Sequence, residues 1–166
     1  MRVSSKRRRP NRVAEARRPP AAGVAVQYGL SRKGLPAPRQ FRRWAEAAFN
    51  GARGSVTLRI VGAAEGARLN RIYRGKRGAT NVLSFPLQDP HAARYVGDVV
   101  ICAPVVKREA RAQGKTPHAH FAHLTAHGVL HLMGYEHETD RQACIMERRE
   151  KDLLKRLGYP DPYLSE

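Results

Sequence analysis

The segment His127-Gly-Val-Leu-His131-Leu-Met-Gly134-Tyr-Glu-His137 carries the strongest structural and chemical signal in the sequence. His127 and His131 are four residues apart in a helical pattern, so they lie on one helix face about one turn, roughly 6 Å, apart. Gly134 supplies the left-handed backbone conformation that ends a helix, which lets the chain turn back and bring His137 to the same point. Three imidazoles can hold one divalent cation and leave a fourth position for water, as in catalytic zinc sites. The segment therefore predicts a helix that carries a metal centre.

The donor type also indicates which ion would bind. Three nitrogen ligands without a thiolate favour one Zn²⁺ ion, with Ni²⁺, Cu²⁺, Fe²⁺ or Co²⁺ as alternative occupants in purified preparations. A lone pair of histidines at this spacing is common in packed helices, and the third histidine after the glycine is what favours a metal site. His120 and His123 continue the same helical stripe upstream, too far away to bind the same ion. We expect them to pack or to support the ligands.

The segments around this helix predict the remaining architecture. Alternating and β-branched residues predict strands at 24–28, 55–61, 81–85 and 98–102. Helical patterns cover 38–49, 65–73, 105–113, 117–133 and 138–157. In the helix expected at 65–73, the residues that should be buried are Ala67, Leu69 and Ile72. Because the strands precede residue 103 and three helices follow it, we predict a single α+β domain. It would contain a small mixed four-stranded sheet packed with about five helices around a zincin-like, histidine-bearing central helix.

The charge is strongly positive and unevenly distributed. The 166 residues include 31 Lys and Arg against 14 Asp and Glu, a formal net charge of +17. Residues 1–20 alone hold eight basic residues and one acid, so +7 lies there and +10 on the rest. We expect residues 1–22 to form a disordered basic tail and residues 23–166 to form one catalytic domain. A basic folded domain favours polyanionic partners, with RNA or DNA first among them.

Composition excludes several classes of protein. The longest apolar candidate, residues 95–106, is interrupted by Asp98 and is too short for a membrane span, so we expect a soluble protein with no membrane partner. Cys102 and Cys144 are far apart and form no CxxC motif, which argues against a disulfide framework or a cysteine zinc ribbon. This cysteine usage fits a reducing compartment.

The histidine spacing resembles the H-E-x-x-H-x-x-G-x-x-H zinc site of the metzincin proteases. Those proteases use the glutamate of that motif as a general base, whereas this chain has Gly128 there, which has no side chain to take a proton. A zincin-like metallohydrolase or endopeptidase remains an alternative, but it would need its base from elsewhere.

Four blocks in order resemble the YbeY metal-dependent endoribonucleases, which are rRNA maturation factors. Residues 127–137 match the signature H-G-x-L-H-L-x-G-Y-D-H, with Glu136 in place of the aspartate. Residues 70–86 are similar to the Tyr-Arg-Gly and T-N-V-L-S-F-P block, residues 97–102 to the G-D-V-x-I-C strand, and residues 157–163 to the tail. Arg77 departs from the aspartate that the family often has after Gly-Lys.

The resemblance implies a single-strand-specific, zinc-dependent endoribonuclease that processes ribosomal RNA, notably the small-subunit 3′ end. It also implies a role in ribosome quality control in the bacterial cytoplasm, with single-stranded rRNA and the ribosome or its associated proteins as partners. On this basis His127, His131 and His137 hold the zinc, and Arg74 of the Tyr-Arg-Gly motif is catalytic.

The chemistry of these residues is consistent with that role. A guanidinium can bind two oxygens of a phosphodiester transition state while a metal polarises another or activates water. Asn81, Ser84 and Asp98 are candidate cleft residues, although strand-edge hydrogen bonding or turn formation would explain them equally well. We expect no small-molecule organic cofactor. A non-catalytic ribosome-binding protein, with the metal only stabilising the fold, is a further alternative.

Overall fold

The structure is a computed structural model that describes residues 22–87 and 94–164. Within these ranges the strands are β1 (Ala22–Tyr28), β2 (Gly54–Val61), β3 (Val82–Pro86) and β4 (Tyr95–Cys102). The helices are α1 (Pro38–Phe49), α2 (Ala63–Arg74), α3 (Ala103–Ala112), α4 (Pro117–Leu132) and α5 (Asp140–Leu157). The predicted α+β domain with a small mixed sheet and five helices is thus confirmed. The expected tail lies outside the described residues except for Ala22, where β1 begins.

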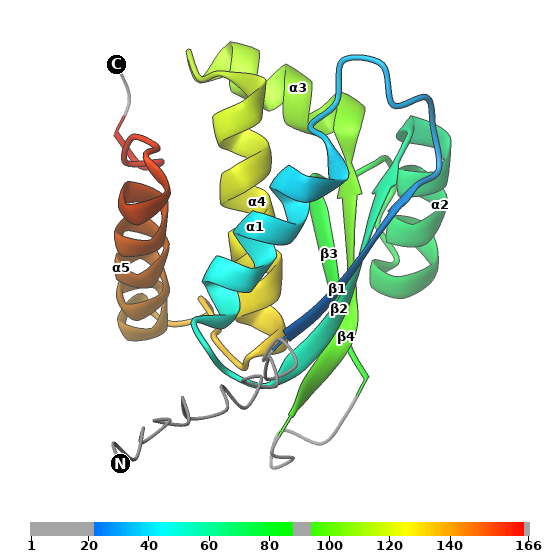
Figure 1. The fold of residues 1–166 in the computed structure, drawn as a ribbon. Helices are drawn as coiled ribbons and strands as arrows, with labels where there is room; N and C mark the ends of the chain where they lie inside the picture. The colour runs from blue at the N-terminus through cyan, green and yellow to red at the C-terminus, as the bar shows by residue number, and fades with distance from the viewer. Residues whose placement is uncertain (1–21, 88–93, 165–166) are drawn as a thin grey trace, which may run out of the picture.

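The sheet has the strand order β1-β2-β4-β3 (Figure 1). β1 pairs with β2 and β2 with β4 in parallel, whereas β3 runs antiparallel to β4. Gly97 of β4 pairs with Pro86, and a Cβ atom at this position would lie 2.5 Å from the carbonyl oxygen of Phe85. Only glycine allows β3 to approach β4 this closely, so Gly97 helps to fix the edge of the sheet beside which the site forms.

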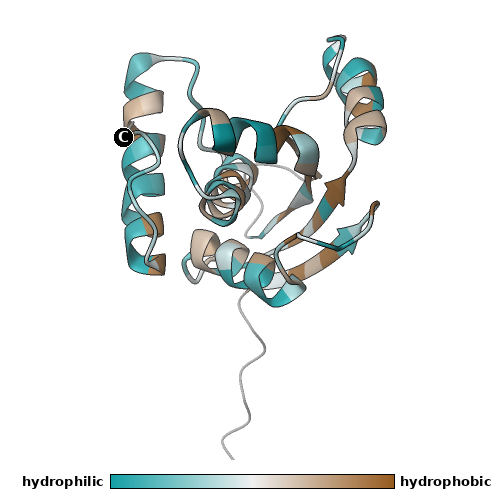
Figure 2. Ribbon diagram, turned by 90° about the horizontal axis from the view of Figure 1, so that it is seen from above, coloured by the Kyte–Doolittle hydropathy of each residue, from teal (hydrophilic) through white to brown (hydrophobic). Residues whose placement is uncertain are grey.

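The helices form layers on the two faces of the sheet. α1 and α4 cover one face, α5 packs on the far side of α4, and α2 lies on the opposite face (Figure 1). Seen from above, α5 is mainly hydrophilic, as expected for an outer helix (Figure 2). In the described part of the chain, no helix combines the length and the apolar character that crossing a bilayer requires.

The expected burial in α2 holds for Leu69, which packs against the core cluster on that face of the sheet, but is wrong for Ile72. Ala67 and Leu69 are only partly buried, and Ile72 is 58% exposed. The buried residues of α2 are Gly66 and Asn70, and a Cβ atom at Gly66 would lie 3.0 Å from the Sγ atom of Cys102. The helix therefore approaches the sheet through a small residue, and this leaves Ile72 pointing away from the core.

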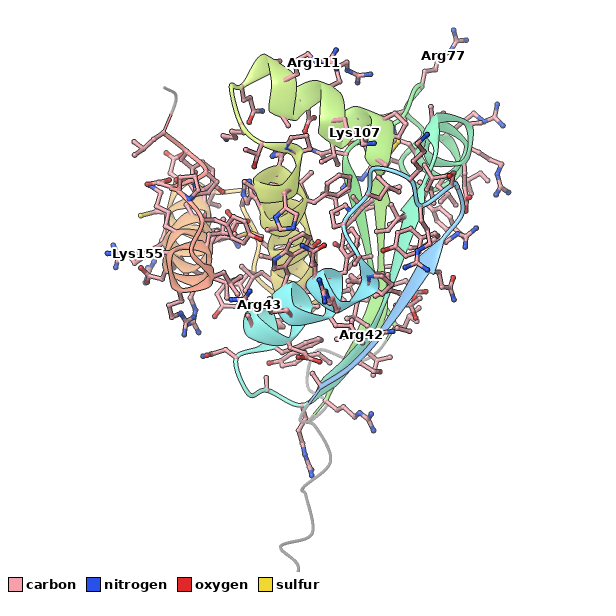
Figure 3. All side chains as sticks on the ribbon, turned by 45° about the horizontal axis from the view of Figure 1, so that its top comes forward. Arg42, Arg43, Arg77, Lys107, Arg111 and Lys155 are labelled. Carbon is pink, nitrogen blue, oxygen red and sulfur yellow. The ribbon has the colours of Figure 1, made fainter. Side chains whose placement is uncertain are left out.

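Basic side chains extend from several elements into solvent (Figure 3). Among the labelled residues, Arg42 and Arg43 belong to α1, Arg111 to α3 and Lys155 to α5, and all four are exposed. Arg77 extends from the turn that follows α2. The positive charge of the domain is thus spread over its surface.

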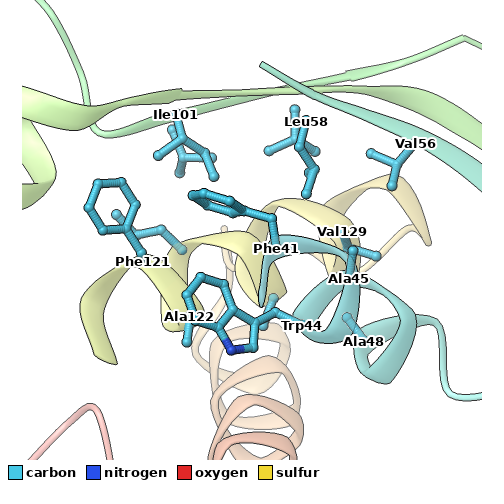
Figure 4. Close-up of a cluster of buried hydrophobic side chains, with 14 of the residues drawn as sticks. Phe41, Trp44, Ala45, Ala48, Val56, Leu58, Ile101, Phe121, Ala122 and Val129 are labelled. Atoms are coloured by element: carbon cyan, nitrogen blue, oxygen red, sulfur yellow. The ribbon is translucent and has the colours of Figure 1, made fainter. Parts of the chain in front are cut away.

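The main core lies between the sheet and the α1–α4 layer (Figure 4). Phe41 contacts Trp44 and Phe121 edge-to-face, with ring centroids 5.3 and 5.9 Å apart. Val129 of α4 is fully buried in the same cluster. Burial of these large side chains holds α4 against the sheet. The position of the histidines on this helix is therefore set by the core.

Candidate metal centre

Helix α4 positions two of the three histidines of the predicted site. Thr116 caps its N-terminus by accepting a hydrogen bond from the backbone N–H of Ala119. The helix ends at Leu132, and Gly134 has a φ of +89°, the left-handed conformation predicted for it. The chain then turns back, and this return places His137 beside the side chains of His127 and His131.

The three imidazoles converge on one point. The ring centroids of His127 and His131 are 4.6 Å apart. The ring centroid of His137 lies 5.5 Å from that of His127 and 4.9 Å from that of His131. One nitrogen from each ring can be chosen so that all three lie within 4.8 Å of one another. The Nε2 atoms of His127 and His131 are 3.1 Å apart. Two nitrogens at the usual zinc distance would be about 3.3 Å apart in a tetrahedral site, so this donor set fits a zinc ion.

The electrostatics of the cluster keep a central donor neutral. Burial, together with the neighbouring imidazoles of His127 and His137, lowers the pKa of His131 to about 4. At neutral pH the lone pair of His131 is therefore available for coordination. Its Nδ1 atom lies 3.6 Å from a carboxylate oxygen of Glu136, which is half exposed at the rim of the site. The Glu136 carboxylate therefore lies on the metal-ligand side of its segment.

Glu150 of α5 contacts the histidine cluster and was not singled out from the sequence. Its side chain is fully buried, and its Oε1 atom lies 2.5 Å from Nδ1 of His127. Burial opposes ionisation of this carboxyl, but hydrogen bonds and charge from His123 and His127 outweigh it and lower the pKa of Glu150 to about 2. The ionised carboxylate can only accept, so Nδ1 of His127 donates to it. This fixes the tautomer of His127 and leaves its Nε2 lone pair directed at the metal position.

Two further side chains hold the Glu150 carboxylate in place. Tyr163 donates its hydroxyl hydrogen bond to Oε2, and Nε2 of His123 lies 3.5 Å from the same oxygen. Burial and the Glu150 charge raise the pKa of Tyr163 well above its usual value, so its hydroxyl remains a donor. A signal for Glu150 exists in the sequence, because its acidic side chain shares the buried face of α5 with Met146, Leu153 and Leu154.

His123, His127 and Glu150 also form a cluster whose donor atoms lie within 4.8 Å of one another. In that cluster His127 would use Nδ1, which the Glu150 contact already occupies. His120, expected to pack or to support the ligands, is buried and lies 2.8 Å from a carboxylate oxygen of Glu109. His120 therefore has a packing role next to α3, whereas His123 faces the carboxylate that orients a ligand.

A hollow of about 520 Å³ opens over the three histidines. Arg74, the exposed last residue of α2, also lines it, and Gly75 ends that helix with a φ of +64°. Asn81 and Ser84 line the same hollow, whereas Asp98 lines a different one on the face of the sheet. The fold thus brings Arg74 into one hollow with three histidines more than 50 positions away in sequence.

Gly128 is required by packing. A Cβ atom at this position would lie 2.5 Å from Cγ1 of Val99 and 3.3 Å from Oγ of Ser84. Ser84 donates a hydrogen bond to the carbonyl oxygen of Gly128 at 3.1 Å, which ties α4 to β3. No glutamate fits here, so the carboxylate that a metzincin carries at this position has no place in this fold.

A family model and two curated relatives identify the same family. The sequence model described as Endoribonuclease YbeY matches residues 35–158. Endoribonuclease YbeY of Stenotrophomonas maltophilia (strain K279a) is 51% identical over 158 residues, covering 90% of this chain and 98% of the relative. Endoribonuclease YbeY of Methylobacillus flagellatus is 51% identical over 147 residues, covering 89% and 97%. A Thermotoga maritima protein solved in solution shares the fold, with a TM-score of 0.56 and 22% identity over 85% of this chain and 99% of that one.

Proposed function

This chain belongs to the YbeY endoribonuclease family, and from that premise we propose that it is a zinc-dependent endoribonuclease acting on single-stranded ribosomal RNA. We assign it to maturation of the small-subunit 3′ end and to ribosome quality control in the bacterial cytoplasm, with single-stranded rRNA and the ribosome or its associated proteins as partners. The observation that carries the proposal is the hollow that Arg74 lines together with His127, His131 and His137.

The donor set supports the metal assignment. His127, His131 and His137 would hold the zinc, which when bound supplies a Lewis acid for a phosphodiester oxygen or a water. The Glu150 carboxylate keeps His127 in the tautomer that this requires.

Arg74 would supply the complementary charge for the substrate. Its guanidinium presents planar paired donors that match two oxygens of a phosphodiester, where negative charge increases in the transition state. Arg74 and His137 are exposed, and His127 and His131 are partly buried in the same hollow, so the backbone of a single strand can reach the guanidinium and the histidines at once. A hollow lined by polar side chains suits the polyanionic substrate expected from the net charge of +17.

A panel of substrates tests the proposal. Purified chain is incubated with single-stranded RNA, duplex RNA, single-stranded DNA and casein, before chelation, after chelation and after zinc is restored. We expect cleavage of single-stranded RNA that chelation abolishes and zinc restores, with casein intact. Casein cleavage would support the peptidase alternative instead.

The ribosome-binding alternative needs a separate arm. The His131→Ala variant is tested for bound zinc and for rRNA processing in cells that lack the wild-type protein. We expect both to be lost. Normal rRNA 3′ ends in cells whose variant holds no zinc would instead support a non-catalytic role.

A further inference from the structure

The last turn of α2 exposes apolar side chains that the core does not use. Tyr73 is 62% exposed and Ile72 is 58% exposed. The ring of Tyr73 packs edge-on against Phe85 of β3, with centroids 4.9 Å apart and an interplanar angle of 63°. This contact holds the tyrosine ring in one orientation while most of its surface remains open to solvent.

Tyr73 lines a second hollow of about 550 Å³ on the α2 side of the sheet. Phe85, Leu87, Asp98 and Thr57 are among its other lining residues. The next residue, Arg74, lines the hollow of the metal centre. The end of α2 therefore stands between the two hollows, with an aromatic side chain on one side and a guanidinium on the other.

The charge at this end of α2 suits a polyanion. Within residues 63–77 the chain has five basic residues, all of them exposed: Arg68, Arg71, Arg74, Lys76 and Arg77. Arg77 extends into solvent beyond the helix (Figure 3). The one acid of this segment, Glu65, is bound to Arg59 of β2 at 2.6 Å. A strand that crosses the end of α2 would thus meet arginine and lysine side chains for its phosphates.

We propose that Tyr73 is a base-stacking platform for single-stranded RNA that runs from the sheet-face hollow into the metal centre. A base would stack on the exposed ring of Tyr73 while the neighbouring phosphate reaches Arg74. The Asp98 carboxylate in the same hollow accepts hydrogen bonds, which suits base amino groups rather than phosphates. This inference rests on the proposed RNA substrate and adds where the strand next to the cleaved bond lies.

RNA fits this surface better than a protein partner does. Exposed Ile72 and Leu87 add apolar surface near the ring, but the five exposed basic side chains of residues 63–77 outnumber them. The adjacent residues Tyr73 and Arg74 line this hollow and the metal hollow in turn. Stacking on aromatic rings combined with a basic path for the backbone is the usual mode of single-strand binding.

The test measures binding rather than cleavage. Fluorescence anisotropy with a labelled single-stranded octaribonucleotide is recorded for the full chain in chelator, which keeps the RNA intact. We expect Tyr73→Ala to weaken binding about tenfold, the effect usual for loss of one stacked base. Tyr73→Phe should keep the affinity because the ring remains. Ile145→Ala on α5 is the matched control, since Ile145 is also a half-exposed apolar residue and lines neither hollow.

An oligonucleotide with one base removed at each position in turn identifies the stacked base. In the wild-type chain, removal of one particular base should weaken binding about tenfold, and in Tyr73→Ala the same removal should cost nothing more. If the folded Tyr73→Ala variant binds the RNA with unchanged affinity, the proposal is overturned. This holds also if the variant no longer binds a ribosomal protein, because the surface would then be a protein-binding site. If wild-type chain binds RNA through Tyr73 but does not cleave it with zinc, the platform stands and the proposed nuclease activity fails.

Discussion

Removing the charge of Glu150 should weaken zinc binding, although this residue is not itself a ligand. In the structure its ionised carboxylate accepts from Nδ1 of His127 at 2.5 Å and also from the hydroxyl of Tyr163. In Glu150→Gln the side chain keeps its shape, but one amide oxygen must replace two carboxylate oxygens and the charge is lost. Carboxylates that orient a ligating histidine are typically worth about 10- to 100-fold in metal affinity. We expect about tenfold for Glu150→Gln, which is about 1.4 kcal/mol, and up to about 100-fold for Glu150→Ala.

The assay is competition for zinc against a chromophoric chelator at neutral pH. Asp152→Asn is the matched control, because Asp152 lies on the same helix but is exposed. Circular dichroism establishes that each variant is folded, and the near-isosteric glutamine keeps the test valid if the alanine variant does not fold. Zinc affinities of Glu150→Gln and Glu150→Ala within twofold of wild type would refute the inference that the buried carboxylate fixes the tautomer of His127.

Three further predictions follow from the same geometry. Gly128→Ala should lower the free energy of unfolding, measured by urea titration, by about 1–2 kcal/mol. The clash of the new methyl group with Val99 outweighs the higher helix propensity of alanine. A variant as stable as the wild type, or more stable, would contradict the packing argument. Arg74→Ala should reduce kcat/KM for RNA about 100-fold with zinc content unchanged, and Arg74→Lys should restore only part; full activity in Arg74→Ala would exclude its role. When the pH falls from 7 to 5, the free energy of unfolding of the metal-free protein should decrease by about 2 kcal/mol. The reason is that His131 takes up a proton near pH 6.5 in the unfolded chain but only near its pKa of about 4 in the folded one. A pH-independent stability, or the same decrease in His131→Ala, would refute this.

Local sequence patterns were enough for most of the fold. The helix predicted at 38–49 is α1, and the strand predicted at 55–61 is β2 with one more residue at its start. The strand predicted at 98–102 is longer, because β4 begins at Tyr95 and runs through Gly97. A glycine lowers the strand propensity of its segment, so the local pattern did not predict a strand through Gly97. The glycine is needed at this position because β3 approaches β4 closely, which a local pattern does not reveal.

The burial of α2 could not be predicted from its large apolar residues. Periodicity assigns the inward face to Ile72, but the helix contacts the sheet through Gly66, beside Cys102. A small residue that permits close packing adds nothing to a hydrophobic pattern, so the pattern identified Leu69 but wrongly extended the buried face to Ile72.

The three histidines were predictable because their spacing is local, whereas Glu150 was not because its role depends on packing between helices. A single carboxylate in an amphipathic helix is usually solvated. Only the docking of α5 on α4 places it against His127. Arg74 likewise reaches the hollow of the histidines only through the fold, because α2 and α4 lie on opposite faces of the sheet.

The most direct test of the account is a zinc titration of the metal-free chain, read as the initial cleavage rate of a single-stranded RNA that carries a fluorophore and a quencher. We predict that the rate rises from zero and reaches its plateau at about one zinc per chain, the stoichiometry of a three-histidine centre. His131→Ala should stay at zero throughout the titration. Full cleavage before zinc is added, or a wild-type rate in His131→Ala, would contradict the claim that these histidines form the catalytic centre.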